Sequence, residues 1–264
     1  MKIGFIGCGN MAKAIIAGLI GNNMFEPDEI IASDKNASAL EEAEAKLGIH
    51  TTSNNSELVL ESETLVLAVK PQVIASVIDE ISDTVSEQKL IISIVAGQSI
   101  ARIKELFGGD VKVVRTMPNT PALVGEGMTA MCYGNNVTHV EAQYAAQILG
   151  SFGKVETVPE SIMDAVVAVS GSSPAYVAMM IEAMADAAVL KGMPRNQAYT
   201  FAAQAVLGTA KLIMETGKHP AEIKDMVCSP AGTTIEAVKV LEERGFRSSI
   251  IEAMEACAEV SSKL

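Results

Sequence analysis

The stretch Lys2-Ile3-Gly4-Phe5-Ile6-Gly7-Cys8-Gly9-Asn10-Met11-Ala12 decides the fold of this chain. An apolar run enters a Gly-x-Gly-x-x-Ala pattern, and an amphipathic stretch follows at residues 14–19. Gly7 permits a tight turn, Gly9 lets the backbone approach a pyrophosphate, and Ala12 lets the next helix pack on the strand. The start of that helix offers free N–H groups and a partial positive charge to phosphates. The pattern therefore predicts a dinucleotide-binding turn, with a plain glycine-rich turn as the alternative. The expected cofactor contacts here are Ile6, Gly7, Cys8, Gly9, Asn10 and Met11.

Composition limits the classes of protein to consider. The 264 residues are 49% apolar and 20% charged, with a net charge of −12. This acidic balance argues against nucleic acid and anionic membranes as partners. The four cysteines show no CxxC spacing, so we expect reduced thiols in a cytoplasmic protein. The least charged long stretch, residues 165–181, is interrupted by Ser-Gly-Ser-Ser-Pro, and we expect it to be too short and too broken to span a bilayer.

The first part of the chain alternates strand and helix patterns. This alternation predicts an α/β fold with a doubly wound, mostly parallel sheet of the Rossmann type. Strands are expected at residues 3–6, 29–33, 64–69, 90–94 and 111–116, and helices at 38–47, 72–81 and 100–107. The continuous apolar runs at 64–69 and 90–94 are typical of buried central strands.

After Pro159 the strand pattern ends. Helices are expected at 175–191, 197–216, 221–226, 233–243 and 248–262. We therefore divide the chain into a dinucleotide-binding domain, residues 1–160, and a helical domain, residues 161–264. The helices at 175–191 and 197–216 are rich in alanine and apolar nearly all round, which is typical of buried helices. Since about a hundred residues bury such helices poorly alone, we expect this half to form a homodimer interface.

The end of the strand at 29–33 normally reads the adenosine ribose in this fold. If Asp34 points at the ribose, it accepts hydrogen bonds from both hydroxyls and favours NAD. If Ser33 takes that position with Lys35 nearby, a 2′-phosphate can be held and NADP is favoured. Solvated loop charges are the third reading of Asp34 and Lys35, so cofactor preference stays open at this point.

Loops at the carboxyl ends of further strands are the next candidates, because ligands bind there in such sheets. Lys70 follows an apolar strand and is expected at the mouth of the crevice, where a cation suits phosphate or carboxylate; a solvated lysine is the alternative. Asn119, in the loop 117–121 fixed by two prolines, could offer an amide to nicotinamide or substrate; a purely structural turn is the alternative.

Residues 229–235 open the last but one helix. Thr233, Thr234 and their neighbouring N–H groups form a helix N-terminus, which is a natural carboxylate site. An N-cap without a ligand is the alternative. His50, His139 and His219 are scattered and form no metal-ligand spacing, so no metal is expected.

Taken together, these stretches resemble pyrroline-5-carboxylate reductases. The residues that carry the resemblance are 4–12, Ala68-Val69-Lys70-Pro71, Ser170-Gly171-Ser172-Ser173-Pro174-Ala175-Tyr176, and 220–242 with Ser229-Pro230-Ala231-Gly232-Thr233-Thr234 at its centre. The resemblance spans essentially the whole chain. It implies reduction of Δ1-pyrroline-5-carboxylate to L-proline by NADPH, or by NADH as the alternative. It also implies a dimer interlocked through the helical domains, in some members assembled into a decamer of five dimers.

The resemblance also implies roles for individual residues. Ser33 is similar to the family's ribose or 2′-phosphate contact, and Asn55 to an adenosine-side contact. The nicotinamide-side wall is expected from Ala68, Val69, Lys70, Pro71, Ala96 and Gly97. Substrate contacts are expected from Asn119, Ser173, Gly232, Thr233 and Thr234, with the Thr234 hydroxyl near the imine nitrogen. Thr234 and Lys70 are therefore the expected catalytic residues.

One departure from the family pattern is Ala231, where many relatives have glycine. Two other functions fit parts of the chain. A β-hydroxyacid dehydrogenase shares this two-domain plan but uses an interdomain lysine, and this chain has none in that region until Lys191. A nucleotide-binding regulator would bind the cofactor without turnover.

Overall fold

The computed structural model describes residues 2–263, which form two compact units. The first comprises the described residues up to Ser172 together with the C-terminal stretch from Cys257, and the second comprises residues 173–256. The expected boundary at residue 160 and the observed one differ, because Met163 and Val166, in the helical stretch after Glu160, pack against the core of the first unit. Hydrogen bonds from Ser261 to Asp164 (2.7 Å) and from Cys257 to Ser172 (3.2 Å) fix the C-terminal end to the same unit.

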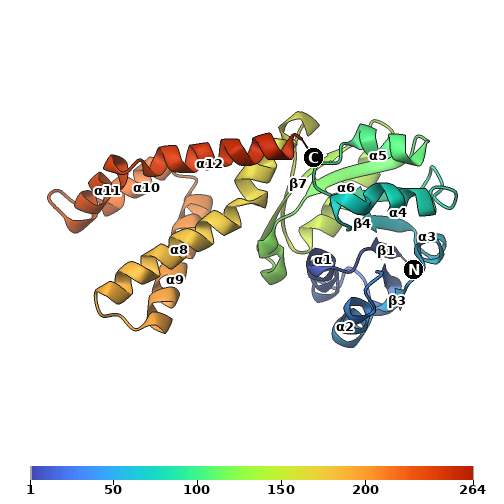
Figure 1. Cartoon of the computed structure of the whole chain (residues 1–264), viewed down its shortest axis with the longest axis horizontal. Coiled ribbons are helices and arrows are strands. Elements are labelled where there is room, and N and C mark those ends of the chain that lie inside the picture. The colour runs from blue at the N-terminus through green and yellow to red at the C-terminus, as the bar shows by residue number, and fades with distance from the viewer. Residues whose placement is uncertain (1, 264) are drawn as a thin grey trace. The chain divides into compact units, whose positions relative to one another are not determined.

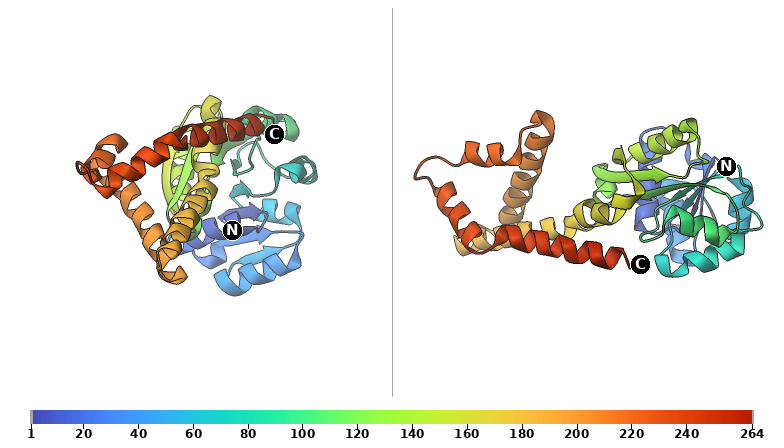
Figure 2. Two further views of the ribbon diagram at one scale, coloured as in Figure 1. Left: turned by 60° about the vertical axis from the view of Figure 1, so that its left-hand side comes forward. Right: turned by 90° about the horizontal axis from the view of Figure 1, so that it is seen from above.

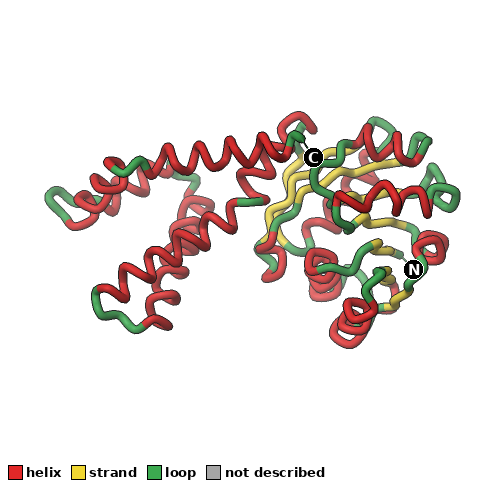
Figure 3. The backbone as a smooth tube through the Cα atoms, viewed as in Figure 1, coloured by secondary structure: helices red, strands yellow, loops and turns green. Residues whose placement is uncertain are grey.

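The first unit is built on an eight-stranded sheet in the order β3-β2-β1-β4-β5-β6-β7-β8 (Figures 1 and 3). Its strands are β1 (Ile3–Ile6), β2 (Ile30–Ser33), β3 (His50–Thr52), β4 (Thr64–Leu67), β5 (Leu90–Ser93), β6 (Lys112–Met117), β7 (Gly127–Tyr133) and β8 (Gly153–Thr157). All neighbouring strands run parallel except β6 and β7. The predicted doubly wound, mostly parallel sheet is confirmed, whereas β3, β7 and β8 were not expected.

Helices cover both faces of this sheet (Figure 2). One face packs against α1 (Asn10–Gly21), α2 (Ala37–Leu47) and α6 (His139–Gly150), and the other against α3 (Asn55–Glu61), α4 (Ile74–Ile81) and α5 (Ile100–Phe107). Adjacent strand residues alternate between the two cores, as Leu65 and Val66 do on β4. Two-sided burial explains why the central strands are continuously apolar.

The helices of the second unit contain few buried residues. These helices are α8 (Ser173–Leu190), α9 (Arg195–Thr216), α10 (Pro220–Val227), α11 (Thr233–Glu243) and the larger part of α12 (Phe246–Ser261). Helices α8 and α9 lie side by side (Figure 1). Only Ala185, Ala198, Ala202 and Ile223 are fully buried hydrophobic residues among 173–256, while Met179, Leu190 and Phe201 are each more than 60% exposed.

The stretch expected to be broken at residues 170–174 is a continuous helix, so that expectation is wrong. A short α-helix, α7 (Met163–Val166), continues through a π-helical turn, Val167–Gly171, into α8. The Ser172 N–H donates to the Val167 carbonyl (2.8 Å), and Pro174 then falls in the first turn of α8, where a missing N–H is tolerated. Residues Glu160–Leu190 form a helical segment long and apolar enough to cross a membrane, although buried core helices pass the same test.

Candidate active site

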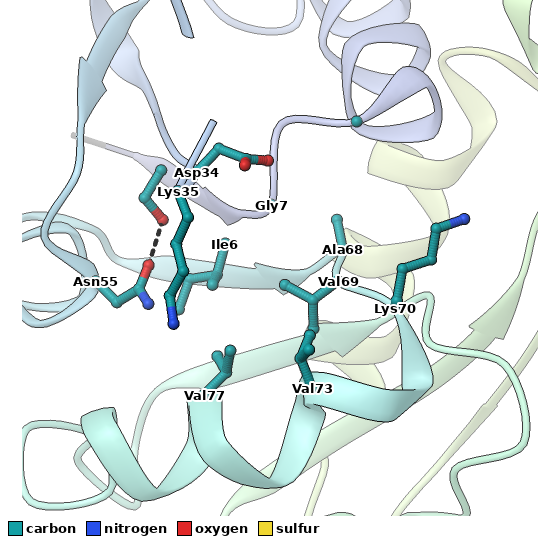
Figure 4. A pocket seen from close by; sticks show the side chains of 12 residues that line it. Ile6, Gly7, Asp34, Lys35, Asn55, Ala68, Val69, Lys70, Val73 and Val77 are labelled. Carbon is teal, nitrogen blue, oxygen red and sulfur yellow. Dashed lines mark hydrogen bonds between the residues drawn. The ribbon is translucent and has the colours of Figure 1, made fainter. Parts of the chain in front are cut away.

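Two adjoining cavities lie over the carboxyl ends of the parallel strands in the first unit. The first cavity, about 300 Å³, is lined by Ile6, Gly7, Gly9, Ser33, Asp34, Lys35, Asn55, Ala68, Val69, Lys70, Val73 and Val77 (Figure 4). The second cavity, about 620 Å³, is lined by Gly9, Asn10, Met11, Ala12, Ala68, Val69, Lys70, Pro71, Ile94, Ala96, Met117, Pro118, Thr120 and Leu123. Gly9 and the three residues that follow β4 line both, so the cavities form one continuous groove.

The glycine-rich turn separates β1 from α1 and requires its first glycine. Gly7 has φ +100°, and a Cβ there would lie 2.5 Å from the Ala68 carbonyl oxygen. Gly9 differs, because a Cβ there would meet no atom within 4 Å. It faces open space at the N-terminus of α1, where no side chain caps the first-turn N–H groups. This arrangement leaves room and hydrogen-bond donors for a diphosphate.

Asp34 is held against the glycine-rich turn. Its carboxylate accepts hydrogen bonds from the N–H groups of Cys8 (2.8 Å) and Asn36 (2.9 Å). In Figure 4 the carboxylate points toward the turn at Gly7, whereas the Lys35 side chain extends across the cavity in the direction of Asn55. Asp34 therefore stabilises the turn, and Lys35 is the cation at this end of the first cavity.

Ser33 and Asn55 form the buried polar end of the first cavity. The Ser33 side chain is fully buried, and its hydroxyl donates to Asn55 Oδ1 (2.7 Å). Asn55 Nδ2 donates in turn to Glu80 Oε2 on α4 (3.0 Å). Asn55 begins α3 after the N-cap Asn54, and this local capping fixes its position beside β2.

Two expected cofactor residues lie outside the cavity linings. The buried Cys8 thiol donates to the Ala39 carbonyl (3.8 Å), and burial raises its pKa. Gly7 and Gly9 on either side of Cys8 line the groove, whereas the Cys8 side chain points into the core. Gly97 follows the lining residue Ala96 in a turn with φ +73°, so it shapes the loop without lining either cavity.

Asn119 does not present its amide to either cavity. Its Nδ2 donates to the Ser170 carbonyl (3.0 Å), and its Oδ1 accepts from the Met128 N–H (2.8 Å). It thereby ties the loop after β6 to β7 and to the π-helical turn. This geometry favours the alternative, a purely structural turn, over the expected contact with nicotinamide or substrate. Its neighbours Pro118 and Thr120 line the second cavity instead.

Sequence reasoning missed several apolar wall residues. Val73 and Val77 line the first cavity from the region where α4 begins, and Leu123 lines the second from the 3₁₀ turn Thr120–Val124. The spacing of Val73 and Val77, four residues apart after Lys70-Pro71, is a signal that a helix face turns toward the cavity.

The second unit contains the other expected site residues, Ser173, Gly232, Thr233 and Thr234. Gly232 is the N-cap of α11 and has no side chain to cap it, so the first-turn N–H groups have no such partner. The Gly232 N–H itself donates to the Ser229 carbonyl (3.0 Å), which closes a turn before the helix. Ala231 has φ +58°, a conformation that favours glycine, and this strain agrees with the departure noted at that position. Ser173 starts α8.

No group of three or more His, Cys, Asp or Glu side chains that could hold a metal ion occurs among residues 2–263. The four cysteines are free thiols, of which Cys8 and Cys132 are buried. Burial raises the pKa of Cys132 to about 11.

Comparison with known proteins agrees with this geometry. Residues 160–264 match the profile of pyrroline-5-carboxylate reductase dimerisation domains, and residues 2–97 match the profile of coenzyme F420-dependent NADP oxidoreductases. The pyrroline-5-carboxylate reductases of Escherichia coli (strain K12) and Synechocystis are 49% and 47% identical, in alignments covering 100% of this chain and 98% of each relative. A crystal structure of Plasmodium falciparum pyrroline carboxylate reductase with NADP bound superposes with a TM-score of 0.91 at 31% identity, covering 100% of this chain and 97% of the other. This chain belongs to the pyrroline-5-carboxylate reductase family.

Proposed function

We propose that this protein reduces Δ1-pyrroline-5-carboxylate to L-proline, the last step of proline biosynthesis, with NADPH as the hydride donor and NADH as the alternative. The observation that carries the proposal is the continuous groove over the strand ends, combined with an uncapped helix N-terminus at residues 232–234. Such a groove suits a dinucleotide, and such a helix start suits a small carboxylate.

The cofactor lies along the groove with its diphosphate at the N-terminus of α1. In this proposal the first cavity takes the adenosine end, with Ser33, Lys35 and Asn55 at the ribose. The second cavity takes the nicotinamide, between residues 68–71 and 94–96 on one side and Met117 and Pro118 on the other. Lys70 borders both cavities and supplies a positive charge for the diphosphate or the substrate carboxylate.

The reaction needs positioning and one proton. A hydride from the reduced nicotinamide attacks the C=N carbon of the cyclic imine, and the π-electron pair moves to nitrogen. The N–H groups at the start of α11 hold the substrate carboxylate, which fixes the face that is attacked. The nitrogen takes a proton from the Thr234 hydroxyl, which regains one from solvent water, and water itself is the alternative donor.

We also propose that the chain acts as a homodimer through its helical unit, with the decamer of five dimers as a further level of assembly. The match of residues 160–264 to a dimerisation profile and the exposed apolar side chains of α8 and α9 support this. Pairing would also cover the apolar helix at Glu160–Leu190, which accounts for its composition without a membrane. The small-molecule chemistry and the reduced thiols suit a cytoplasmic enzyme.

The experiment that tests the function follows nicotinamide absorbance after pyrroline-5-carboxylate is added, with each cofactor in turn. Oxidation of NADPH with formation of proline is expected, and the ratio of kcat/KM values measures cofactor preference. No oxidation with either cofactor would overturn the assignment. Binding of both cofactors without turnover of any small imine would indicate a regulator, and turnover of a β-hydroxyacid would indicate the rival dehydrogenase.

A further inference from the structure

A chain of three hydrogen-bonded side chains leads away from the ribose end of the first cavity. Ser33 Oγ donates to Asn55 Oδ1 (2.7 Å), and Asn55 Nδ2 donates to Glu80 Oε2 (3.0 Å). Ser33 and Asn55 are 0% and 7% exposed, while Glu80 reaches them from the exposed side of α4. These hydrogen bonds therefore connect the exposed Glu80 carboxylate to the buried polar end of the cavity, where Figure 4 shows the bond that involves Asn55.

Glu80 determines which group donates in each of these two hydrogen bonds. An ionised carboxylate only accepts hydrogen bonds, so the Asn55 amide must turn its NH₂ group toward Glu80. The Asn55 carbonyl oxygen then faces Ser33, and the Ser33 hydroxyl must donate to it. The second bond depends on the first, because an Asn55 amide turned the other way would place its oxygen against the carboxylate.

This direction determines what Ser33 can offer to a cofactor. With its one proton committed to Asn55, the Ser33 oxygen can only accept a hydrogen bond. A ribose hydroxyl can donate such a bond, whereas a 2′-phosphate carries oxygens that need donors near pH 7. The phosphate must rely on Lys35 and the remaining N–H of Asn55, and the Glu80 charge lies behind that same amide.

The placement of Glu80 on α4 supports this role. Val73 and Val77, which line the first cavity, precede Glu80 by seven and three residues and share its face of the helical segment. The neighbouring carboxylate Asp79 is also exposed but has no hydrogen bond to Asn55. Glu80 and Asp79 are thus a matched pair of acidic residues, of which only Glu80 is hydrogen-bonded to Asn55.

We infer that Glu80 is a positioning residue that lowers the preference of the cofactor site for NADPH over NADH by fixing Ser33 as a hydrogen-bond acceptor. The inference rests on the proposed placement of the adenosine ribose in the first cavity. Without the carboxylate, the Asn55 amide can turn over and donate to Ser33, and the Ser33 hydroxyl can then donate to a 2′-phosphate.

The test measures dissociation constants for NADPH and NADH by calorimetry for the wild type, Glu80→Gln, Glu80→Ala and Asp79→Asn. Both Glu80 variants should shift the ratio of the two constants toward NADPH by about threefold to tenfold, the effect of roughly one ordinary hydrogen bond. Asp79→Asn removes the same charge from the same helix and should change the ratio less than about twofold. Circular dichroism checks that each variant is folded.

Two results would overturn the inference. An equal change in both dissociation constants would show a merely structural role, and a shift in Asp79→Asn as large as in Glu80→Gln would show a general charge effect. Since the measurement needs no substrate, it is separate from the proposed function. A wild type that binds both cofactors but fails to reduce pyrroline-5-carboxylate would contradict the reaction and leave the inference on Glu80 standing.

Discussion

The two units of this chain bury their apolar side chains very differently. The first encloses a sheet between two layers of helices, and its largest side chains, such as Phe5 and Phe152, are fully buried. The second consists of helices, which also carry many apolar side chains but leave residues such as Leu190 and Phe201 largely exposed. Hydrophobic burial is the main favourable term in folding. The first unit thus closes its own core, and the exposed apolar side chains of the second support the proposal that a second copy of the chain covers them.

The largest effect is expected from a charge placed in the apolar groove between α8 and α9. Met184 lines a cavity there with Met180, Ala205 and Ile213. Met184→Glu would bury an unpaired carboxylate on pairing, so the dimer dissociation constant should rise at least about a hundredfold. Analytical ultracentrifugation and the activity assay both measure this. Lys211→Gln, on the solvent-exposed side of α9, is the control; a Met184→Glu protein that is still fully dimeric would contradict the comparison.

A second variant tests how rigidly the first unit is specified. Gly7→Ala places a Cβ against the Ala68 carbonyl at a strained φ, and should lower the free energy of unfolding by about 2–4 kcal/mol. Gly9→Ala meets no atom, so its unfolding free energy should change by less than about 0.5 kcal/mol while cofactor affinity falls. Denaturant unfolding and calorimetry separate the two effects. Equal stability of both variants would refute this account of the turn.

Chemistry in the second unit should depend on the start of α11. Removing the Thr234 hydroxyl takes away the proposed proton donor while the backbone N–H groups remain. Thr234→Ala should reduce kcat/KM by about tenfold or more. Val240→Ala, on the exposed side of the same helix, is the control. If Thr234→Ala stays within about twofold of the wild type, water is the donor.

A smaller effect is expected from the residue that ties loop, strand and π-helical turn together. Asn119→Ala leaves the Ser170 carbonyl and the Met128 N–H without their partner, and should cost about 1–3 kcal/mol of unfolding free energy. The exposed turn residue Asn135 gives the control Asn135→Ala. A loss of substrate affinity without a loss of stability would return Asn119 to the role of a ligand contact.

The smallest effect concerns the acid side of the stability curve. Hydrogen bonds from Lys13 and Lys46 lower the pKa of Glu42 to about 2 from its ordinary value of 4.5. Because the folded-state pKa is the lower one, the contribution is present above about pH 4.5 and is lost as the pH falls toward 2. Glu42→Gln should therefore reduce the fall in stability over this range. Glu41→Gln on the same helix is the control, and identical acid unfolding curves for wild type and Glu42→Gln would contradict the prediction.

The sequence predicted the parts of the fold that rest on local pattern. Helices α5 and α11 were predicted with their observed bounds, and the glycine-rich turn led directly to the cavity. Strand β3 is only three residues long and partly exposed, so it carries no periodic signal. Strand β7 contains Gly127 and Ala130, two residue types that are depleted in strands. Its pairing with β6 and β8 is a tertiary effect that a local window cannot show.

The site was predicted in composition better than in geometry. Asp34 and Asn119 were expected to contact ligands. Their polar atoms instead form hydrogen bonds with backbone groups distant in sequence, in the glycine-rich turn and the π-helical turn respectively. Glu80 lies outside every sequence motif that indicated the site. Its contact with Asn55 arises from the packing of α4 beside α3, which only a three-dimensional structure reveals.

The central claim, that the second unit is completed only by a second copy of the chain, is tested most directly by the mass of the protein in solution. Size-exclusion chromatography with light scattering at micromolar concentration should give at least twice the chain mass of 27.7 kDa. A stable, folded and active species at the mass of one chain would contradict the claim, because the exposed apolar faces of α8 and α9 would then need no partner.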